Sequence, residues 1–520
     1  MKLLSWLHPP KYVQASILIS LGGGLFGLDT GTIGPLTTMA QFEKTFGHLS
    51  STVHGLTVSM ILIPAAISSF FGGHLANSVG RLKGIALGGA IFGLGGGVEA
   101  ASVHLGMLLA GRAVKGIGEG LFLSTLVVYI TEISPPQSRG TLASIPQFLT
   151  TIGVCGGYFI CYGTVNISSS ASWRIPFALQ AILAYAFTIS TLILLPESPR
   201  WLTARGRHDE ALLIWDKLGI ASTEREKIEE RQGDTLPSQV KMKDIFAVFS
   251  KNARRQTGLG VFLMGAQQAS GIDGVLYYAP LLFASAGLSS STASFLASGI
   301  SALLILLVTI PAFLLADRWG RATSTIFGGL VQAACMFIMG ALYASGSVHS
   351  DRGAAKWVVV VLIYVFAMVF SGTWGVCFRV YVSEIQSPET RAGASSLALS
   401  ANWVVNWIIA FTTPIFLANS SFGVYFLFGS AALLTVIVSV FWMPETRGRS
   451  LEDIDAEFSG KHRGQGGGLE SGNESGIMLV DMPSERMVRE DIDNGSGREK
   501  GEVGVSMKVG ERSMTRITVN

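Results

Sequence analysis

The feature of this sequence that most constrains its fold is a succession of apolar stretches long enough to cross a lipid bilayer. A transmembrane helix needs about 20 mostly apolar residues, and clear examples lie at 178–195, 298–316, 357–378 and 422–443. Charged residues make up only 14% of the 520 residues, whereas an average soluble domain contains about 25%. The sequence therefore predicts an all-α membrane protein rather than a soluble protein with a large core.

Twelve transmembrane helices are predicted, in two groups of six, near 14–35, 53–76, 84–104, 107–130, 141–163, 174–195, 257–286, 291–316, 323–345, 356–383, 391–418 and 422–443. The residues after about 460 contain many Ser, Glu and Arg and few aromatics, a composition that favours disorder. We expect an N-terminal six-helix bundle at 1–195, a cytoplasmic linker with short helices at 196–256, a C-terminal six-helix bundle at 257–443, and a mostly disordered cytoplasmic tail at 444–520.

Basic residues gather in the loops of one side. That side carries Arg81, Lys83, Arg139, the basic residues of 200–255, Arg318, Arg321, Arg391, Arg447 and Arg449. By the positive-inside rule this side is cytoplasmic. We therefore expect a multi-pass membrane protein with both termini in the cytoplasm, most naturally in the plasma membrane.

The two groups of helices share landmarks in the same order. Gly80-Arg81 recurs 240 residues later, Glu132 with Arg139 recurs 252 residues later, and Pro196-Glu197 recurs 248 residues later. The counterparts are Gly320-Arg321, Glu384 with Arg391, and Pro444-Glu445. One order at nearly one offset indicates two homologous halves, and carriers of the major facilitator type place a solute site between two such halves.

Six motifs carry a resemblance to a known family. They are Phe-Gly-Leu-Asp-Thr-Gly at 26–31, Gly-Arg at 111–112 with the glycines at 116, 118 and 120, Pro-Glu-Ser-Pro-Arg-Trp at 196–201, Gln-Gln-Ala-Ser-Gly at 267–271, Asp-Arg-Trp-Gly-Arg at 317–321, and Pro-Glu-Thr-Arg-Gly at 444–448. From about residue 20 to 458 the chain resembles the sugar-porter family of the major facilitator superfamily, and in particular its fungal-type sugar transporters.

Sugar recognition needs neutral groups that both donate and accept hydrogen bonds, and aromatic faces that cover the ring. Asn402 and Asn406 are four residues apart on one helical face. The resemblance implies that Gln147, Gln267, Gln268 and Asn406 contact the solute, that Phe26 covers it, and that Tyr277 and Tyr278 lie near the outer gate. The alternative for the amides is hydrogen bonding between helices.

Three departures from the family pattern bear on the solute. The first cytoplasmic motif reads Asn-Ser-Val-Gly-Arg at 77–81, Asp273 and Ala302 replace asparagines, and Val376 and Arg379 replace a proline and a tryptophan. Asp273 and Arg379 are predicted to lie beside the solute, either paired with each other or with Arg379 free to bind a carboxylate. Alternatively, Arg379 extends to the cytoplasm.

Other ionisable residues also fall within predicted spans, where such groups are functional candidates. Asp29 and Arg112 lie at similar depths, and a separable carboxylate–guanidinium pair can take up and release a proton; we predict that they couple transport to protons. The alternative is a static pair. Lys115 and Glu119, at i and i+4, are expected to neutralise each other, and Glu99 is expected to be hydrated near the outer end.

Charged residues at the cytoplasmic ends of the spans match the family's ion-pair network, which the resemblance implies holds the outward-open state. Its predicted members are Arg81, Glu132, Arg139, Glu197, Asp317, Arg321, Glu384, Arg391 and Glu445.

The sequence thus predicts a secondary active transporter of a sugar or sugar-like solute, with proton symport, in a lipid bilayer and functional as a monomer. No nucleotide-binding loop, metal-ligand spacing or nucleophile motif of an enzyme is present, so no enzyme activity, cofactor, metal or nucleic-acid partner is expected. The four cysteines, at 155, 161, 335 and 377, lie in apolar runs. Alternatives that remain are a sugar sensor on a carrier scaffold, a uniporter, and a carrier of polyols or sugar acids.

Overall fold

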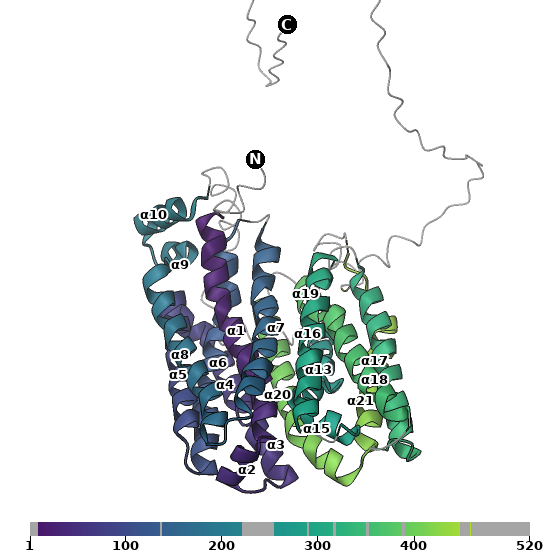
Figure 1. The fold of residues 1–520 in the computed structure, drawn as a ribbon. Coiled ribbons are helices and arrows are strands. Elements are labelled where there is room, and N and C mark those ends of the chain that lie inside the picture. Colours follow the sequence, from purple (N-terminus) through teal and green to yellow (C-terminus); the bar gives the residue numbers. More distant parts are fainter. Residues whose placement is uncertain are drawn as a thin grey trace, which may run out of the picture. The chain divides into compact units, whose positions relative to one another are not determined.

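The computed structural model describes residues 9–135, 138–220, 254–288, 291–315, 319–349, 353–386 and 391–447, together with Phe458. In these residues the chain forms helices and no strand. The helices make two bundles that lie side by side (Figure 1). Most of the predicted linker, Asp317 and the predicted tail after 447, apart from Phe458, lie outside the described residues.

The N-terminal bundle has six long elements, one of which is interrupted. They are α1 (Lys11–Thr37), α3 (Ser51–Ser59) followed by α4 (Leu62–Val79), α5 (Arg81–Ala101), α6 (Leu105–Ile133), α7 (Arg139–Thr164) and α8 (Ala171–Leu194). Shorter helices are α2 (Ala40–Phe46), α9 (Pro199–Ala204) and α10 (His208–Leu218). The last two begin the predicted linker and confirm that it contains short helices.

The C-terminal bundle repeats this plan with more interruptions. Its elements are α13 (Arg254–Ala269), α14 (Ile272–Tyr277), α15 (Ala279–Ser285), α16 (Ser291–Leu315), α17 (Arg321–Ala344), α18 (Ala355–Gly372), α19 (Trp374–Ile385), α20 (Arg391–Asn419) and α21 (Gly423–Trp442). Eleven stretches of the described chain are long and apolar enough to cross a membrane. The remaining predicted span, 257–286, is the broken run α13–α14–α15, which accounts for the predicted twelve.

The break between α13 and α14 has a local cause. Gly271 adopts φ +85°, a left-handed conformation that favours glycine, and the Phe428 ring occupies the space that a Cβ would need there. A second break separates α18 from α19 at Thr373, whose φ and ψ are −124° and −82°. Both interruptions free backbone polar groups inside a bundle, which a membrane protein tolerates where they are buried in protein or line a cavity.

The two bundles touch near the C-terminal end of α1, at the end of the molecule opposite Arg81 and Arg321. We call the end that carries those arginines the basic end. At the other end the Tyr277 carbonyl lies where a Cβ on Gly34 would be, so only glycine permits this approach of α1 to α14. The Tyr158 hydroxyl of α7 donates to the Leu276 carbonyl. This end of the interface is therefore closed.

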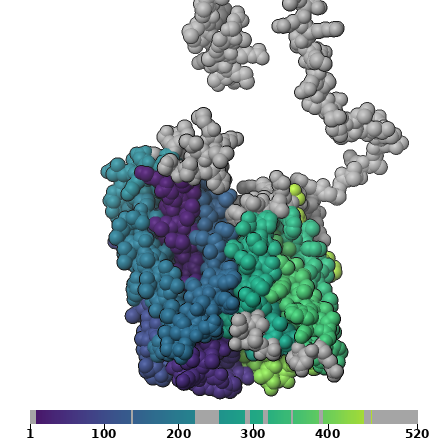
Figure 2. Space-filling view, viewed as in Figure 1, coloured from purple at the N-terminus to yellow at the C-terminus, as the bar shows by residue number. Residues whose placement is uncertain are grey.

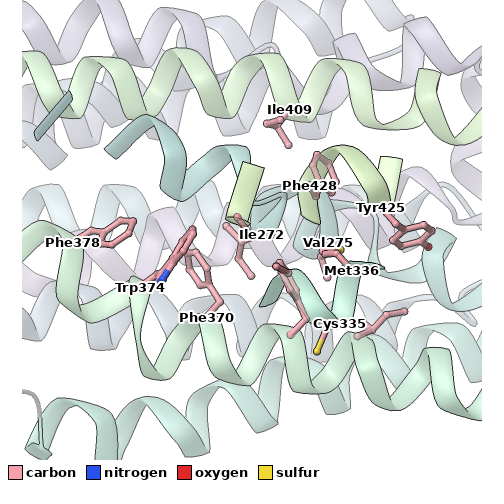
Figure 3. Close-up of a cluster of buried hydrophobic side chains, with 14 of the residues drawn as sticks. Ile272, Val275, Cys335, Met336, Phe370, Trp374, Phe378, Ile409, Tyr425 and Phe428 are labelled. Atoms are coloured by element: carbon pink, nitrogen blue, oxygen red, sulfur yellow. The ribbon is translucent and has the colours of Figure 1, made fainter. Parts of the chain in front are cut away.

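Apolar side chains fill each bundle and also cover its outside. In the C-terminal bundle, α14 contributes Ile272 and Val275 to a buried cluster with Met336, Trp374 and Phe428 (Figure 3). Large apolar side chains are also exposed, including Phe71, Ile182, Ile193, Leu307, Phe327 and Phe441. On the face shown in Figure 2 the two bundles meet along a continuous boundary, where α7 packs against α16. Exposed apolar faces of this extent suit a hydrocarbon surrounding. All four cysteines are buried and free.

Candidate functional site

Four amides and one carboxylate gather where α13, α14 and α20 meet; we call Gln267, Gln268, Asp273, Asn402 and Asn406 the amide cluster. Asn402 Nδ2 donates to Gln267 Oε1 at 3.1 Å, and Gln268 Nε2 donates to Asn402 Oδ1 at 3.3 Å. Asn406 Nδ2 donates to Asp273 Oδ2 at 2.6 Å. The structure thus brings together most of the predicted solute-contacting amides.

The amides of the cluster divide into two kinds. Gln267 also donates from Nε2 to the Trp374 carbonyl at 2.9 Å, so both ends of its amide connect helices. In contrast, Gln268 Oε1 and Asn406 Oδ1 are buried acceptors without a hydrogen-bond partner among the described residues. An acceptor of this kind costs stability unless a donor reaches it. Gln268 and Asn406 therefore have capacity for a hydroxyl donor, whereas Gln267 mainly ties α13 to α19 and α20.

Aromatic side chains border this cluster from both bundles. Phe26 on α1 meets Trp403 on α20 edge to face, with ring centroids 5.7 Å apart. Tyr277 is buried and interacts with the Asn406 side chain. Tyr278 donates from its hydroxyl to the Ala410 carbonyl at 2.6 Å, and so stabilises the closed end. Trp403 did not emerge from the sequence, although an aromatic residue directly after Asn402 was a usable signal.

Gln147, the remaining predicted solute contact, lies on α7 of the other bundle. Its side chain is half-buried, and it forms no side-chain hydrogen bond within the described part of the chain. The structure does not join it to the amide cluster. It leaves the amide free for a solute or for water.

Asp273 and Arg379 do not form an ion pair in this structure. No nitrogen–oxygen contact within 4.0 Å joins them, although the two charges interact electrostatically. Asp273 is half-buried and held by Asn406, whereas the Arg379 side chain is exposed. The predicted direct pair is therefore absent from this state, and the alternative with an available guanidinium fits better.

Asp29 and Arg112 do lie together, with Arg112 Nη2 3.5 Å from Asp29 Oδ2. The surroundings differ from expectation. Lys115 Nζ lies 2.6 Å from Asp29 Oδ1 and 2.7 Å from Glu99 Oε2, rather than pairing with Glu119. We call Asp29, Glu99, Arg112, Lys115 and Glu119 the charge cluster, and all five side chains are buried.

Two predictions about this cluster were wrong. Glu99 is fully buried instead of hydrated, because Arg174 of α8 covers the end of α5 by donating to the carbonyls of Ala100 and Ser102 at 2.6 and 2.8 Å. Glu119 is not neutralised by Lys115, because the lysine extends across to α1 and α5 instead of along α6. Gln180, whose Oε1 accepts a third hydrogen bond from Lys115, was also missed; a lone amide in the apolar run of α8 was its only signal.

The predicted ion-pair network is built twice at the basic end. In the first half, Arg81 donates to both Glu132 oxygens, at 3.0 Å from Nε and 2.8 Å from Nη2. The Glu197 carboxylate accepts from the backbone nitrogens of Arg81 and Leu82, at 3.0 and 3.3 Å. Asn77, which replaces the family aspartate, still accepts from Arg81. A carboxylate on these nitrogens suits the positive N-terminal end of α5.

The second half has the same design. Glu445 accepts from the backbone nitrogens of Arg321 and Ala322, at 2.7 and 3.1 Å. Arg321 Nη2 lies 3.4 Å from Glu384 Oε1, and Thr446 donates to Glu384 Oε2 at 2.6 Å. Among the other predicted members, Asp317 and the Arg391 side chain lie outside the described residues, and Arg139 lies near Glu132 and Arg200 at the basic end.

Burial shapes the electrostatics of the loop that follows α8. It raises the pKa of Glu197, although the backbone nitrogens that the carboxylate accepts from act in the opposite direction. Burial also lowers the pKa of Arg200 to about 10, and the nearby Arg139 adds to this effect. Within the described part of the chain no group of three or more His, Cys, Asp or Glu side chains is placed to hold a metal ion.

Comparison with known sequences agrees with these features. A family described as "Sugar (and other) transporter" matches residues 15–458. A high-affinity glucose transporter of Kluyveromyces lactis is 29% identical over 470 residues, which cover 86% of this chain and 85% of that protein. A probable quinate permease of Neosartorya fischeri is 31% identical over 86% of this chain and 88% of its own length. A galactose-proton symporter of Escherichia coli is 30% identical over 84% and 92%.

Solved structures show the same arrangement of helices. The partially occluded inward-open conformation of the xylose transporter XylE from Escherichia coli superposes with a TM-score of 0.71. The two are 27% identical in sequence, and the match covers 84% of this chain and 99% of that one. A structure of the proton:xylose symporter XylE bound to 6-bromo-6-deoxy-D-glucose gives a TM-score of 0.70 at 26% identity, over 86% and 99% of the two chains.

Proposed function

The chain belongs to the family of sugar and other transporters, and we propose that it moves a sugar, or a solute resembling one, across a membrane by alternating access with proton symport. The observation that carries this proposal is the amide cluster beside the broken helix α13–α14. Its free acceptors on Gln268 and Asn406 and its bordering aromatic rings provide the chemistry that hydroxyl-rich rings require.

Proton coupling is supported by the Asp29–Arg112 pair. Both groups are buried, and Asp29 lies on α1, the helix that contacts α14 of the other bundle. A motion of one bundle against the other can therefore alter the surroundings of this carboxylate. The relatives named as galactose-proton and proton:xylose symporters support the same proposal.

The placement in the membrane follows from charge. We assign the basic end to the cytoplasm and both termini to that side, in the plasma membrane, by the positive-inside rule. The exposed apolar side chains of both bundles then face lipid. With the opposite end closed, the protein is in an inward-facing state, and one chain contains both bundles needed for transport.

A second candidate solute class is favoured by Arg379. Its guanidinium is exposed and forms no ion pair within the described residues, and a relative of similar identity is named as a quinate permease. A guanidinium binds carboxylates in two-pronged geometry. A sugar acid or another hydroxylated carboxylate is therefore the alternative to a neutral sugar.

Uptake of labelled solutes into cells that lack their own carriers tests these proposals. The panel contains neutral sugars, polyols and sugar acids, each measured at acidic and neutral external pH. Accumulation against a gradient, greater at acidic pH, is the expected result. Binding without uptake would identify a sensor, and pH-independent equilibration would identify a uniporter.

A further inference from the structure

The charge cluster in the N-terminal bundle contains three carboxyl groups and two cations. Asp29, Glu99 and Glu119 face Arg112 and Lys115, and none of the five side chains is more than 3% exposed. An uncompensated charge in such a place is strongly disfavoured, and a buried acid without a cation takes up a proton instead. The count alone implies one protonated carboxyl in this cluster.

The contacts indicate which carboxyl it is. Lys115 has three N–H groups, and they go to Asp29, Glu99 and Gln180. Arg112 adds its charge to the same two acids, with nitrogens 3.5 Å from Asp29 Oδ2 and 3.6 Å from Glu99 Oε1. Both cations are therefore committed to Asp29 and Glu99.

Glu119 differs from the other two acids. Its side chain is 1% exposed, and neither carboxyl oxygen has a hydrogen-bond partner among the described residues. The charged and titratable groups that act on it are Asp29 on α1, Glu99 on α5, Arg112 and Lys115 on its own helix α6, and Tyr277 on α14. The two nearby carboxylates oppose its ionisation, and the cations are satisfied elsewhere.

From this arrangement we infer that Glu119 holds the proton that the carrier exchanges, while Asp29 stays ionised between Lys115 and Arg112. This inference rests on the proposed proton symport and assigns its proton site. On binding, a proton from water forms an O–H bond with a Glu119 oxygen; on release the same bond breaks and the proton returns to water on the other side. Tyr277 belongs to the opposite bundle, so separation of α14 from α1 would change the surroundings of Glu119.

The test compares the purified wild-type protein with Glu119→Gln, which imitates the protonated side chain. The infrared difference spectrum between them, recorded at neutral pH, is expected to contain the carbonyl band of a protonated carboxylic acid. In proteoliposomes Glu119→Gln is expected to lose accumulation driven by external acid and to retain exchange of labelled solute. Glu119→Asp, which restores a carboxyl group, is expected to recover part of the acid-driven accumulation.

Glu43→Gln is the matched control, because Glu43 is an exposed carboxyl on α2; it should leave both the spectrum and transport unchanged. Thermal unfolding of each variant verifies that it is folded. If the difference spectrum lacks the band, or if Glu119→Gln still accumulates solute under an acid gradient, the assignment is wrong. If the wild type itself shows no acid-driven accumulation while the band is present, the proposed symport fails, and the proton on Glu119 is structural.

Discussion

Replacing the paired glutamines of α13 tests the solute site most directly, and the structure predicts different results for the two positions. Gln267 uses its amide between helices, donating to the Trp374 carbonyl at 2.9 Å and accepting from Asn402 at 3.1 Å. Gln268 donates to Asn402 at 3.3 Å and keeps a free buried acceptor. Gln267→Ala should therefore mainly lower stability, whereas Gln268→Ala should mainly lower solute affinity.

The magnitudes follow from the number of partners left unsatisfied. A buried polar group without a partner costs about 1–3 kcal/mol. Gln267→Ala leaves the Trp374 carbonyl in this condition and should lower the free energy of unfolding by about that amount. For Gln268→Ala the solute hydroxyl loses a partner, and a loss of about 1–3 kcal/mol corresponds to roughly 5- to 150-fold weaker binding.

The assay is solute binding to purified protein, measured together with thermal unfolding. Gln332→Ala is the matched control, because Gln332 is a buried amide on α17 of the same bundle that donates to the Gly328 carbonyl at 3.2 Å; it should alter stability and leave affinity unchanged. The double variant Gln267→Ala/Gln268→Ala should lose detectable binding while still reaching the membrane. Wild-type affinity in Gln268→Ala, or a loss of affinity in Gln332→Ala equal to that in Gln268→Ala, would refute the site.

Three further variants address the charged groups. Asp29→Asn should abolish acid-driven accumulation in proteoliposomes and spare exchange, because two cations then face two carboxyls and no excess proton is held; undiminished accumulation contradicts this. Arg379→Trp should reduce uptake of sugar acids more than uptake of neutral sugars, and its effect on thermal stability should add to that of Asp273→Asn, because the two groups are not in contact; strong coupling in this double-mutant cycle would show a pair. Glu197 has a pKa raised by burial, so the folded state holds this proton more tightly than the unfolded state. Its contribution to stability is present below the unfolded value of about 4.3 and is lost as pH rises through the folded pKa. The unfolding temperature of the wild type relative to Glu197→Gln should fall over that interval, and a constant difference would contradict the assignment.

The repeat in the sequence was sufficient to predict much of the architecture. Residues that recur at nearly one offset, such as Glu197 and Glu445, occupy equivalent positions and accept from the first backbone nitrogens of α5 and α17. Their roles were predictable because a helix N-terminus after a conformationally special glycine offers only a few donors. The amides of α13 and α20 were predictable for a similar reason, since polar groups in apolar spans must find each other or a solute.

The charge cluster was not predictable from spacing along one helix. The i and i+4 rule pairs Lys115 with Glu119, but it ignores partners on neighbouring helices. The close approach of α5 to α6 at Gly95 and Gly111 brings Glu99 within reach of Lys115, and α1 brings Asp29. A long flexible side chain then follows the stronger field of two carboxylates. Such a choice depends on distances between helices, which no single-helix pattern contains.

The position of Tyr277 suggests how the two clusters act on each other. This side chain interacts with Asn406 of the amide cluster and feels the charges of Asp29 and Glu119, while its own carbonyl rests against Gly34 of α1. α14 is short and bounded by breaks at Gly271 and Tyr278, so it can move without the rest of α13. A solute that engages Asn406 alters the contacts of α14, and any shift of α14 against α1 alters the field at Glu119. Solute binding and proton binding are thereby linked through one short helix, and by linkage each must affect the affinity for the other equally.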